Sequence, residues 1–166
     1  MNNSYVNLIE NKNNFFFVTA HPDDVIVFFA GLIYKLRQDN KNVAVVTVTN
    51  GARGSRENKI TEEELAKTRK AEEINALKVL GVKEENIHCL EHNDGEFESN
   101  YELIGEILKY IRKYKADLVG THEPSVNYTM TYDKSGYFVQ HRGHRKVGEA
   151  VMDSVYPFSR DTSFFP

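Results

Sequence analysis

The stretch Phe15-Phe16-Phe17-Val18-Thr19-Ala20-His21-Pro22-Asp23-Asp24 decides the fold that we expect for this chain. Its apolar half predicts a buried strand over residues 15–20, of the kind that lies in the middle of a parallel sheet. Its polar half places a histidine, a proline and two carboxylates where that strand emerges from the sheet. Three ionisable side chains within four residues predict either a metal site or an acid–base site.

Composition narrows the class of protein. With 166 residues, 40% of them hydrophobic and 27% charged, the chain can form one domain with a sizeable core. A net charge of -3 gives no electrostatic case for nucleic acid or a membrane surface as partner. The single cysteine, Cys89, excludes an intrachain disulfide framework and a cysteine-rich zinc site, and it agrees with the cytoplasmic location that we expect. We see no signal-peptide pattern, and the apolar runs are far shorter than the ~20 residues of a membrane span.

The rest of the chain alternates between predicted strands and helices. We expect further strands at residues 43–49, 87–90 and 116–121, and helices at about 24–38, 61–80, 101–114 and 141–154. This order predicts a Rossmann-like three-layer α/β/α fold with a mostly parallel sheet. Ligands of such folds bind beyond the carboxyl ends of the strands, so the polar clusters that follow the strands should meet at one edge.

His141-Arg142-Gly143-His144 is the second polar cluster. Two imidazoles three residues apart lie on one side of a helical first turn. One of them completes a His/Asp/His set with the first cluster, and such a set suits Zn²⁺ with one position open for water. The other imidazole can stabilise negative charge on a reacting oxygen.

Both clusters also have a purely structural interpretation. In the first, an aspartate caps the following helix and His21 merely ends the strand. In the second, the histidines belong to a solvated basic segment with three neighbouring cations, which are Arg142, Arg145 and Lys146.

A glycine-bearing loop, Asn50-Gly51-Ala52-Arg53-Gly54-Ser55, follows the second predicted strand. Its backbone N–H groups suit a phosphate, although the loop lacks the Gly-Lys-Ser/Thr ending of a Walker A motif. The remaining histidines lack a partner at ligand spacing, and we interpret them as structural or peripheral; they are His88, His92 and His122.

Together these motifs resemble the zinc-dependent N-deacetylases of the PIG-L/LmbE-like family. The resemblance runs from about Phe15 to Gly148 and includes more than the two histidine motifs. The further matching segments are Thr49 to Gly54, Arg69-x-x-Glu72 with Leu80-Gly81-Val82, and Asn93-Asp94-Gly95.

The resemblance implies a role for each matching residue. The implied zinc ligands are His21, Asp24 and His144, and the implied general base is Asp23. His141 would stabilise the oxyanion or assist protonation, while Arg69 and Asp94 would contact the sugar of the substrate. The list of implied site residues is therefore His21, Asp23, Asp24, Arg69, Asp94, His141 and His144.

The implied reaction is amide hydrolysis by zinc-activated water. It removes the acetyl group from an N-acetylglucosamine-type amino sugar or its conjugate and yields acetate and a free amine. Imidazole and carboxylate suit Fe²⁺ as well as Zn²⁺, so the native metal stays open. The expected partner is a small-molecule amino sugar, with no nucleic acid and no membrane, and a homo-oligomer is left open.

Two motifs depart from the family pattern. Val25 stands where the family usually has glutamate, and Gly143 stands where its His-Pro-Asp-His motif has aspartate. Loss of that aspartate should lower the pKa of His141 and weaken its electrostatic role. Asp133 and Glu123, in the loop before the motif, are candidates to replace it.

The chain is also short for the family. We expect residues 1–166 to form a single deacetylase domain that is truncated or minimal at its C-terminal end. Two alternatives to an active enzyme remain. One is a weak or inactive relative that binds a sugar or a metal, and the other is a nucleotide-binding module that uses Gly51 and Gly54.

Overall fold

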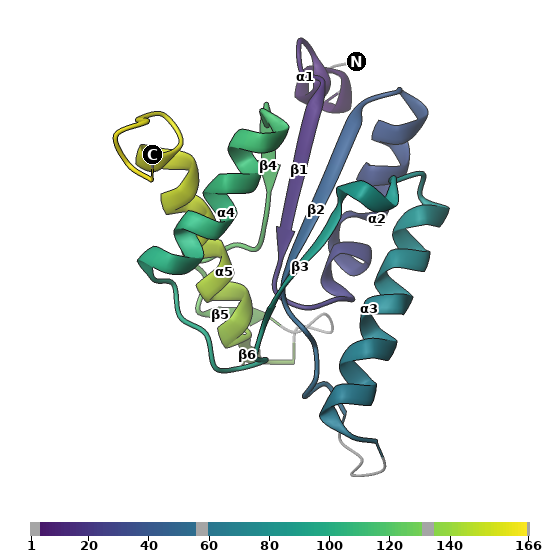
Figure 1. The fold of residues 1–166 in the computed structure, drawn as a ribbon, viewed down its shortest axis with the longest axis vertical. Helices are drawn as coiled ribbons and strands as arrows, with labels where there is room; N and C mark the ends of the chain where they lie inside the picture. Colours follow the sequence, from purple (N-terminus) through teal and green to yellow (C-terminus); the bar gives the residue numbers. More distant parts are fainter. Residues whose placement is uncertain (1–3, 56–59, 131–134, 166) are drawn as a thin grey trace.

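A four-stranded parallel sheet forms the centre of the computed structural model, which describes residues 4–55, 60–130 and 135–165. Its strand order is β3-β2-β1-β4 (Figure 1). The strands are β1 (Asn14–Thr19), β2 (Asn42–Thr49), β3 (Ile87–His92) and β4 (Leu118–Gly120). A separate antiparallel pair joins β5 (Tyr128–Met130) to β6 (Tyr137–Val139).

Helices cover both faces of the sheet and make three layers (Figure 1). Phe15 and Phe17 of β1 join the core cluster under one pair of helices, whereas Phe16 and Val18 join the cluster under the other pair. The alternation explains the near-continuous apolar run, because both faces of the strand are buried. The predicted α/β/α architecture is confirmed. The two pairs are α2 (Asp24–Gln38) with α3 (Glu62–Val79), and α4 (Tyr101–Tyr114) with α5 (Arg142–Asp153).

Local sequence signals set the helix ends. Thr61 and Glu64 form a capping box at the start of α3, and Gly81 follows its C-terminal end with φ at 85°. The side chain of Asn100 accepts a hydrogen bond from the N–H of Leu103 and caps α4. These helices therefore begin and end within about two residues of the predicted bounds.

Several short elements were not predicted. Helix α1 (Ser4–Ile9) occupies the segment expected as a polar lead-in, and Tyr5 ties it to Asp39 after α2. The β5–β6 pair occupies part of the segment expected as a loop over residues 122–140. Three-residue strands and single helical turns carry too little periodicity to be recognised in a sequence. The remaining short elements are a 3₁₀ turn (Glu84–Asn86) and a π-helical turn (Ser154–Phe158).

The carboxyl ends of β1 and β2 are fastened together below the site. The carbonyl oxygen of Ala20 accepts hydrogen bonds from the N–H of Thr49 at 2.9 Å and from its hydroxyl at 2.8 Å. Gly51 then turns the chain at φ 66°, and a Cβ there would lie 2.9 Å from Cδ of Pro22. The glycine loop is therefore built to pack against the His21–Asp24 turn.

A buried carboxyl group lies between β2 and α3. Glu73 is 3% exposed, and the hydroxyl of Thr47 donates a hydrogen bond to it. Burial raises the pKa of Glu73 to about 8, although the bond from Thr47 acts in the opposite direction. The folded protein thus holds a proton on Glu73 at pH values where the unfolded chain has lost it.

This proton makes stability depend on pH. Between the ordinary glutamate value of 4.5 and about 8 the folded state binds the extra proton, so stability should fall as pH rises through this window. We expect Glu73→Gln, which keeps a partner for Thr47, to remove a slope on the order of 1 kcal/mol per pH unit. Urea unfolding at pH 5 to 8 measures it, with the exposed Glu63→Gln of the same helix as control. Equal slopes in Glu73→Gln and wild type would contradict the assignment.

Candidate metal centre and active site

A pocket of about 340 Å³ opens at the carboxyl edge of the sheet. Every site residue implied by the family resemblance lines it. The strand order explains this convergence, because β1 lies between β2 and β4 at the point where the chain changes direction across the sheet. The lining includes His21, Asp23, Asp24, Arg69, Asp94, His141 and His144, together with Gly51, Arg53 and Gly54 of the glycine loop.

Asp24 is the buried centre of this pocket, with 6% of its surface exposed. Its Oδ1 lies 3.0 Å from Nε2 of His144. Its Oδ2 accepts a hydrogen bond from the backbone N–H of His21 at 2.8 Å and lies 3.1 Å from Nδ1 of the same residue. One carboxylate thus joins the end of β1 to the first turn of α5.

Asp23 is placed differently from its neighbour. It is the N-cap residue of α2, yet within the described structure its side chain makes no capping hydrogen bond. The side chain is exposed and lines the pocket instead. The helix-capping interpretation therefore does not account for Asp23.

Electrostatics in the pocket favours a charged Asp24. Burial alone would raise its pKa, but contacts with the imidazoles of His122, His144 and His21 outweigh burial and hold the pKa well below its usual range. Burial likewise disfavours a proton on His21, yet its bonds to Asp24 and Asp94 raise the pKa of His21 to about 9. The two carboxylates therefore favour a positive charge on the His21 ring.

The third imidazole belongs to His122, which sequence reasoning set aside as structural or peripheral. His122 is 6% exposed, and its Nε2 lies 3.3 Å from Oδ2 of Asp24 and accepts the N–H of Ala20 at 3.0 Å. Its ring stacks on His144 with centroids 4.0 Å apart and planes 2° apart. The Phe28 ring meets both imidazoles edge-on. This residue therefore lies inside the site and fixes the orientation of its neighbours.

His141 caps α5 with its own side chain. Its Nδ1 accepts the N–H of Gly143 at 3.2 Å, so a neutral His141 carries its proton on Nε2. Burial, helped by the nearby His21 and His144, lowers the pKa of His141, which is the direction expected for a missing aspartate. The neutral ring is accordingly a hydrogen-bond donor.

The structure shows what surrounds Val25, one of the departures from the family pattern, and Glu123, a candidate substitute for the missing aspartate. Val25 is fully buried in the core cluster with α2 and α3, away from the pocket lining. Glu123 accepts hydrogen bonds from Ser125 and is exposed, so nothing links it to His141 in the described structure. Asp133 lies outside the described residues. Glu123 is therefore not supported as a substitute for the aspartate, whereas the prediction for Asp133 stays untested.

Arg69 and Asp94 reach the pocket from different segments, namely α3 and the loop after β3. Oδ1 of Asp94 lies 3.3 Å from Nε2 of His21, and that contact lowers the pKa of the Asp94 carboxyl. Arg69 lines the pocket from α3 and pairs with Glu72 at 3.2 Å. The glycine loop also reaches the pocket, but its Arg53 is already paired with carboxylates, which weakens the phosphate interpretation of that loop.

The donor atoms suit a borderline divalent cation. Two overlapping groups have ligand atoms within 4.8 Å of one another, and His144 belongs to both. Imidazole nitrogen and carboxylate oxygen fit Zn²⁺ or Fe²⁺. Because Nε2 of His122 already accepts the N–H of Ala20, this residue fits a supporting role better than a ligand role. The groups are His21, His141 and His144, and Asp24, His122 and His144.

Comparison with known proteins agrees with this geometry. The model of the family PIG-L, described as GlcNAc-PI de-N-acetylase, matches residues 16–155. A diacetylchitobiose deacetylase of Thermococcus kodakarensis is 32% identical over 138 residues, which are 83% of this chain and 47% of the relative. None of the helices within residues 4–55, 60–130 and 135–165 has the length and apolar character of a membrane span.

Solved structures share the fold. The N,N'-diacetylchitobiose deacetylase of Pyrococcus horikoshii, complexed with an inhibitor, is 28% identical with a TM-score of 0.79; the match covers 93% of this chain and 55% of that one. A 4-carboxy-2-hydroxymuconate hydratase of Pseudomonas putida, 17% identical, covers 86% and 55% with a TM-score of 0.69 and shows the fold alone. The chain spans about half the length of these relatives.

The support given by His122 can be measured through metal binding. Replacement by alanine removes the ring that stacks on His144 and contacts Asp24, and such partners typically contribute ten- to a hundredfold to metal affinity. We expect His122→Ala to lose Zn²⁺ affinity in about this range, as measured by chelator competition. His88→Ala, a partly buried histidine that bonds to Tyr114 away from the pocket, is the control. Wild-type affinity in His122→Ala would contradict the supporting role.

Proposed function

The chain belongs to the PIG-L family of GlcNAc-PI de-N-acetylases, and from this premise we propose that it is a metal-dependent amide hydrolase. The proposed reaction removes the acetyl group from an N-acetylated amino sugar of the N-acetylglucosamine type, or from its conjugate. The observation that carries the proposal is that two adjacent carboxylates have different surroundings in one pocket. Asp24 is buried among imidazoles, and Asp23 faces the same pocket without a capping bond.

We propose His21, Asp24 and His144 as the metal ligands. Zn²⁺ bound there would supply Lewis acidity, which polarises an amide carbonyl and lowers the pKa of a water molecule. Fe²⁺ suits the same nitrogen and oxygen donors. The low pKa of Asp24 keeps its carboxylate charged, as a ligand must be.

The chain's own side chains supply the proton transfers. Asp23 takes a proton from the attacking water as the new C–O bond forms. His141, neutral with its proton on Nε2, donates a hydrogen bond to the developing oxyanion. Protonated Asp23 then returns the proton to the amine nitrogen while the C–N bond breaks, which gives acetate and a free amine.

Substrate orientation falls to Arg69 and Asp94 in this proposal. A guanidinium and a carboxylate that line the same pocket can donate to and accept from the hydroxyl groups of a sugar. A small-molecule amino sugar is therefore the proposed partner, and the cytoplasm is the proposed compartment.

A catalytically weak relative is the second candidate, and Gly143 favours it. The position offers no carboxylate to polarise His141, and the hydrogen bond to its ring comes instead from the N–H of Gly143. This candidate predicts bound metal without acetate release.

Two substitutions, Asp23→Asn and His144→Ala, distinguish the proposed general base from a proposed metal ligand. We expect Asp23→Asn to lower kcat for acetate release from N,N'-diacetylchitobiose by at least ~10²-fold, since general base catalysis contributes 10²–10⁴. Its zinc content, measured by elemental analysis, should equal that of wild type, whereas His144→Ala should lose the metal. The exposed Asp153→Asn serves as control.

Two outcomes would overturn this assignment. One is retained zinc in His144→Ala, which contradicts the ligand set. The other is wild-type turnover in Asp23→Asn, which contradicts the base. Zinc-loaded wild-type protein that releases no acetate would favour the weak relative.

A further inference from the structure

We propose that Arg142 is a positioning residue that fixes the Asp94 loop, residues 93–98, against the metal-binding end of α5. The inference rests on the proposed function in one respect, namely that Asp94 contacts the substrate. Arg142 stands in the second position of the His141–His144 motif, where the family usually has proline, and it has no part in the mechanism above.

Arg142, the first residue of α5, binds the backbone of the loop. Its Nη1 donates to the carbonyl oxygen of Gly95 at 3.2 Å and to that of Phe97 at 2.9 Å. Its Nη2 contacts the carboxylate of Glu98. One planar guanidinium thus engages three successive parts of the loop, which a single-point donor cannot do.

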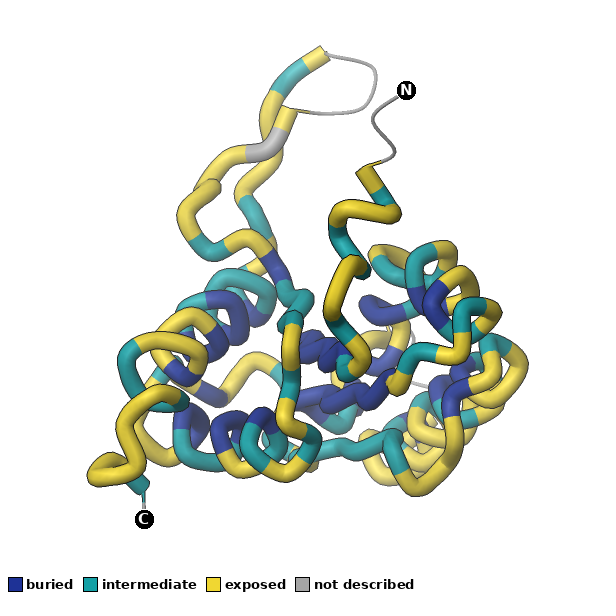
Figure 2. The backbone as a smooth tube through the Cα atoms, turned by 90° about the horizontal axis from the view of Figure 1, so that it is seen from above, coloured by how far each residue is buried: buried dark blue, intermediate teal, exposed yellow. Residues whose placement is uncertain are grey.

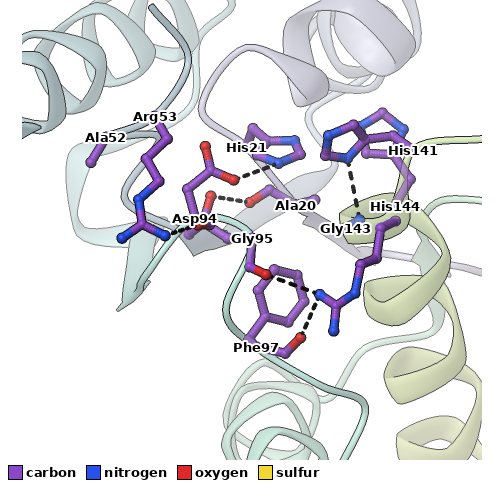
Figure 3. A network of polar contacts seen from close by, with 12 residues as sticks. Ala20, His21, Ala52, Arg53, Asp94, Gly95, Phe97, His141, Gly143 and His144 are labelled. Atoms are coloured by element: carbon purple, nitrogen blue, oxygen red, sulfur yellow. Dashed lines mark hydrogen bonds and ion pairs between the residues drawn. The ribbon is translucent and has the colours of Figure 1, made fainter.

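A second arginine, Arg53, also binds the loop. Nη1 of Arg53, in the glycine loop, donates to the carbonyl oxygen of Asp94 at 3.1 Å (Figure 3). The same nitrogen donates to Oε1 of Glu96 at 2.6 Å. Gly95 adopts φ 80° between these two anchors. The loop connects β3 to α4 without helix or strand, so side-chain contacts must hold much of its conformation in place.

The loop's position matters because of Asp94. Its carboxylate lies 3.3 Å from Nε2 of His21 and lines the pocket. Arg142 belongs to the same helical turn as His144, so its contacts join the predicted ligand turn to the predicted substrate wall. A shift of the loop would move Asp94 away from the substrate and leave His144 in place.

The two departures in this motif fit together. A Cβ at position 143 would lie 3.2 Å from the His21 ring and 3.2 Å from Nδ1 of His141, so Gly143 lets these rings pack closely on the turn. A proline at position 142 would carry no side-chain donor. Arginine and glycine therefore bring the turn close to His21 and bind it to the Asp94 loop.

The solvent exposure of the Arg142 side chain indicates which of its contacts with the loop are strong. The Arg142 side chain is 41% exposed, so its ion pair with Glu98 contributes little. Hydrogen bonds from a charged donor to two carbonyl groups are stronger and directional. The effect of Arg142 should therefore depend on guanidinium geometry and exceed the effect of its charge alone.

Kinetics of Arg142→Ala and Arg142→Lys test this with N,N'-diacetylchitobiose as substrate. We expect Arg142→Ala to raise KM roughly tenfold, a loss of about 1.4 kcal/mol of binding, with kcat and zinc content nearly unchanged. Arg142→Lys should keep most of the defect, because one ammonium cannot span both carbonyls. The control is Arg145→Ala, which removes the same charge from the same helix where Arg145 contacts Asn127. Wild-type KM in Arg142→Lys would overturn the geometric role.

A double-mutant cycle with Asp94→Ala tests whether Arg142 acts through Asp94. If it does, Arg142→Ala should add little to the KM defect in the Asp94→Ala background. Full multiplication of the two defects would overturn the proposal, as would loss of zinc in Arg142→Ala.

Hydrogen exchange separates this inference from the proposed enzyme activity. Amides of residues 93–98 should exchange several-fold faster in Arg142→Ala than in wild type or Arg145→Ala. Unchanged exchange would overturn the positioning role even in an active enzyme. If wild type releases no acetate, the proposed function fails while this measurement still decides the role of Arg142.

Discussion

The contact of one buried carboxylate, Asp24, with three imidazoles organises the molecule. A charge in the interior is costly unless hydrogen bonds and opposite charges surround it. Here the partners come from three places in the chain, namely the turn after β1, the segment after β4 and the first turn of α5. The fold must therefore bring those three segments together for the site to exist.

The parallel sheet does this through its strand order. β1 is central, with β2 on one side and β4 on the other, so the segments that follow these strands converge at one edge. Figure 2 shows the buried residues concentrated in the middle of the molecule, with exposed backbone at its periphery. The rigid strands and the contact of Gly51 with Pro22 fix the turn that carries the two aspartates. Position in the fold thus makes one of two adjacent carboxylates buried, Asp24, and the other exposed, Asp23.

The sequence predicts most of the fold and the pocket, but it misses residues whose partners lie far away in the chain. The apolar run before His21, the β-branched second strand and the capping signals of α3 act locally, so they reveal strands, helices and the carboxyl-edge pocket. His122 and Arg142 act through partners far away in the chain, and no local pattern marks them. The signal for His122 was its place directly after a predicted strand. The short α1 and the β5–β6 pair were missed because elements of three to six residues show little periodicity.

The central claim is that Asp24, His21 and His144 hold one metal ion between β1 and α5. Anomalous X-ray diffraction at the zinc absorption edge, from crystals of the zinc-loaded chain, tests it most directly. The account predicts one peak at about 2.0–2.2 Å from a nitrogen of His21, a nitrogen of His144 and an oxygen of Asp24. A peak coordinated by His122, or by His141 without Asp24, would contradict the account.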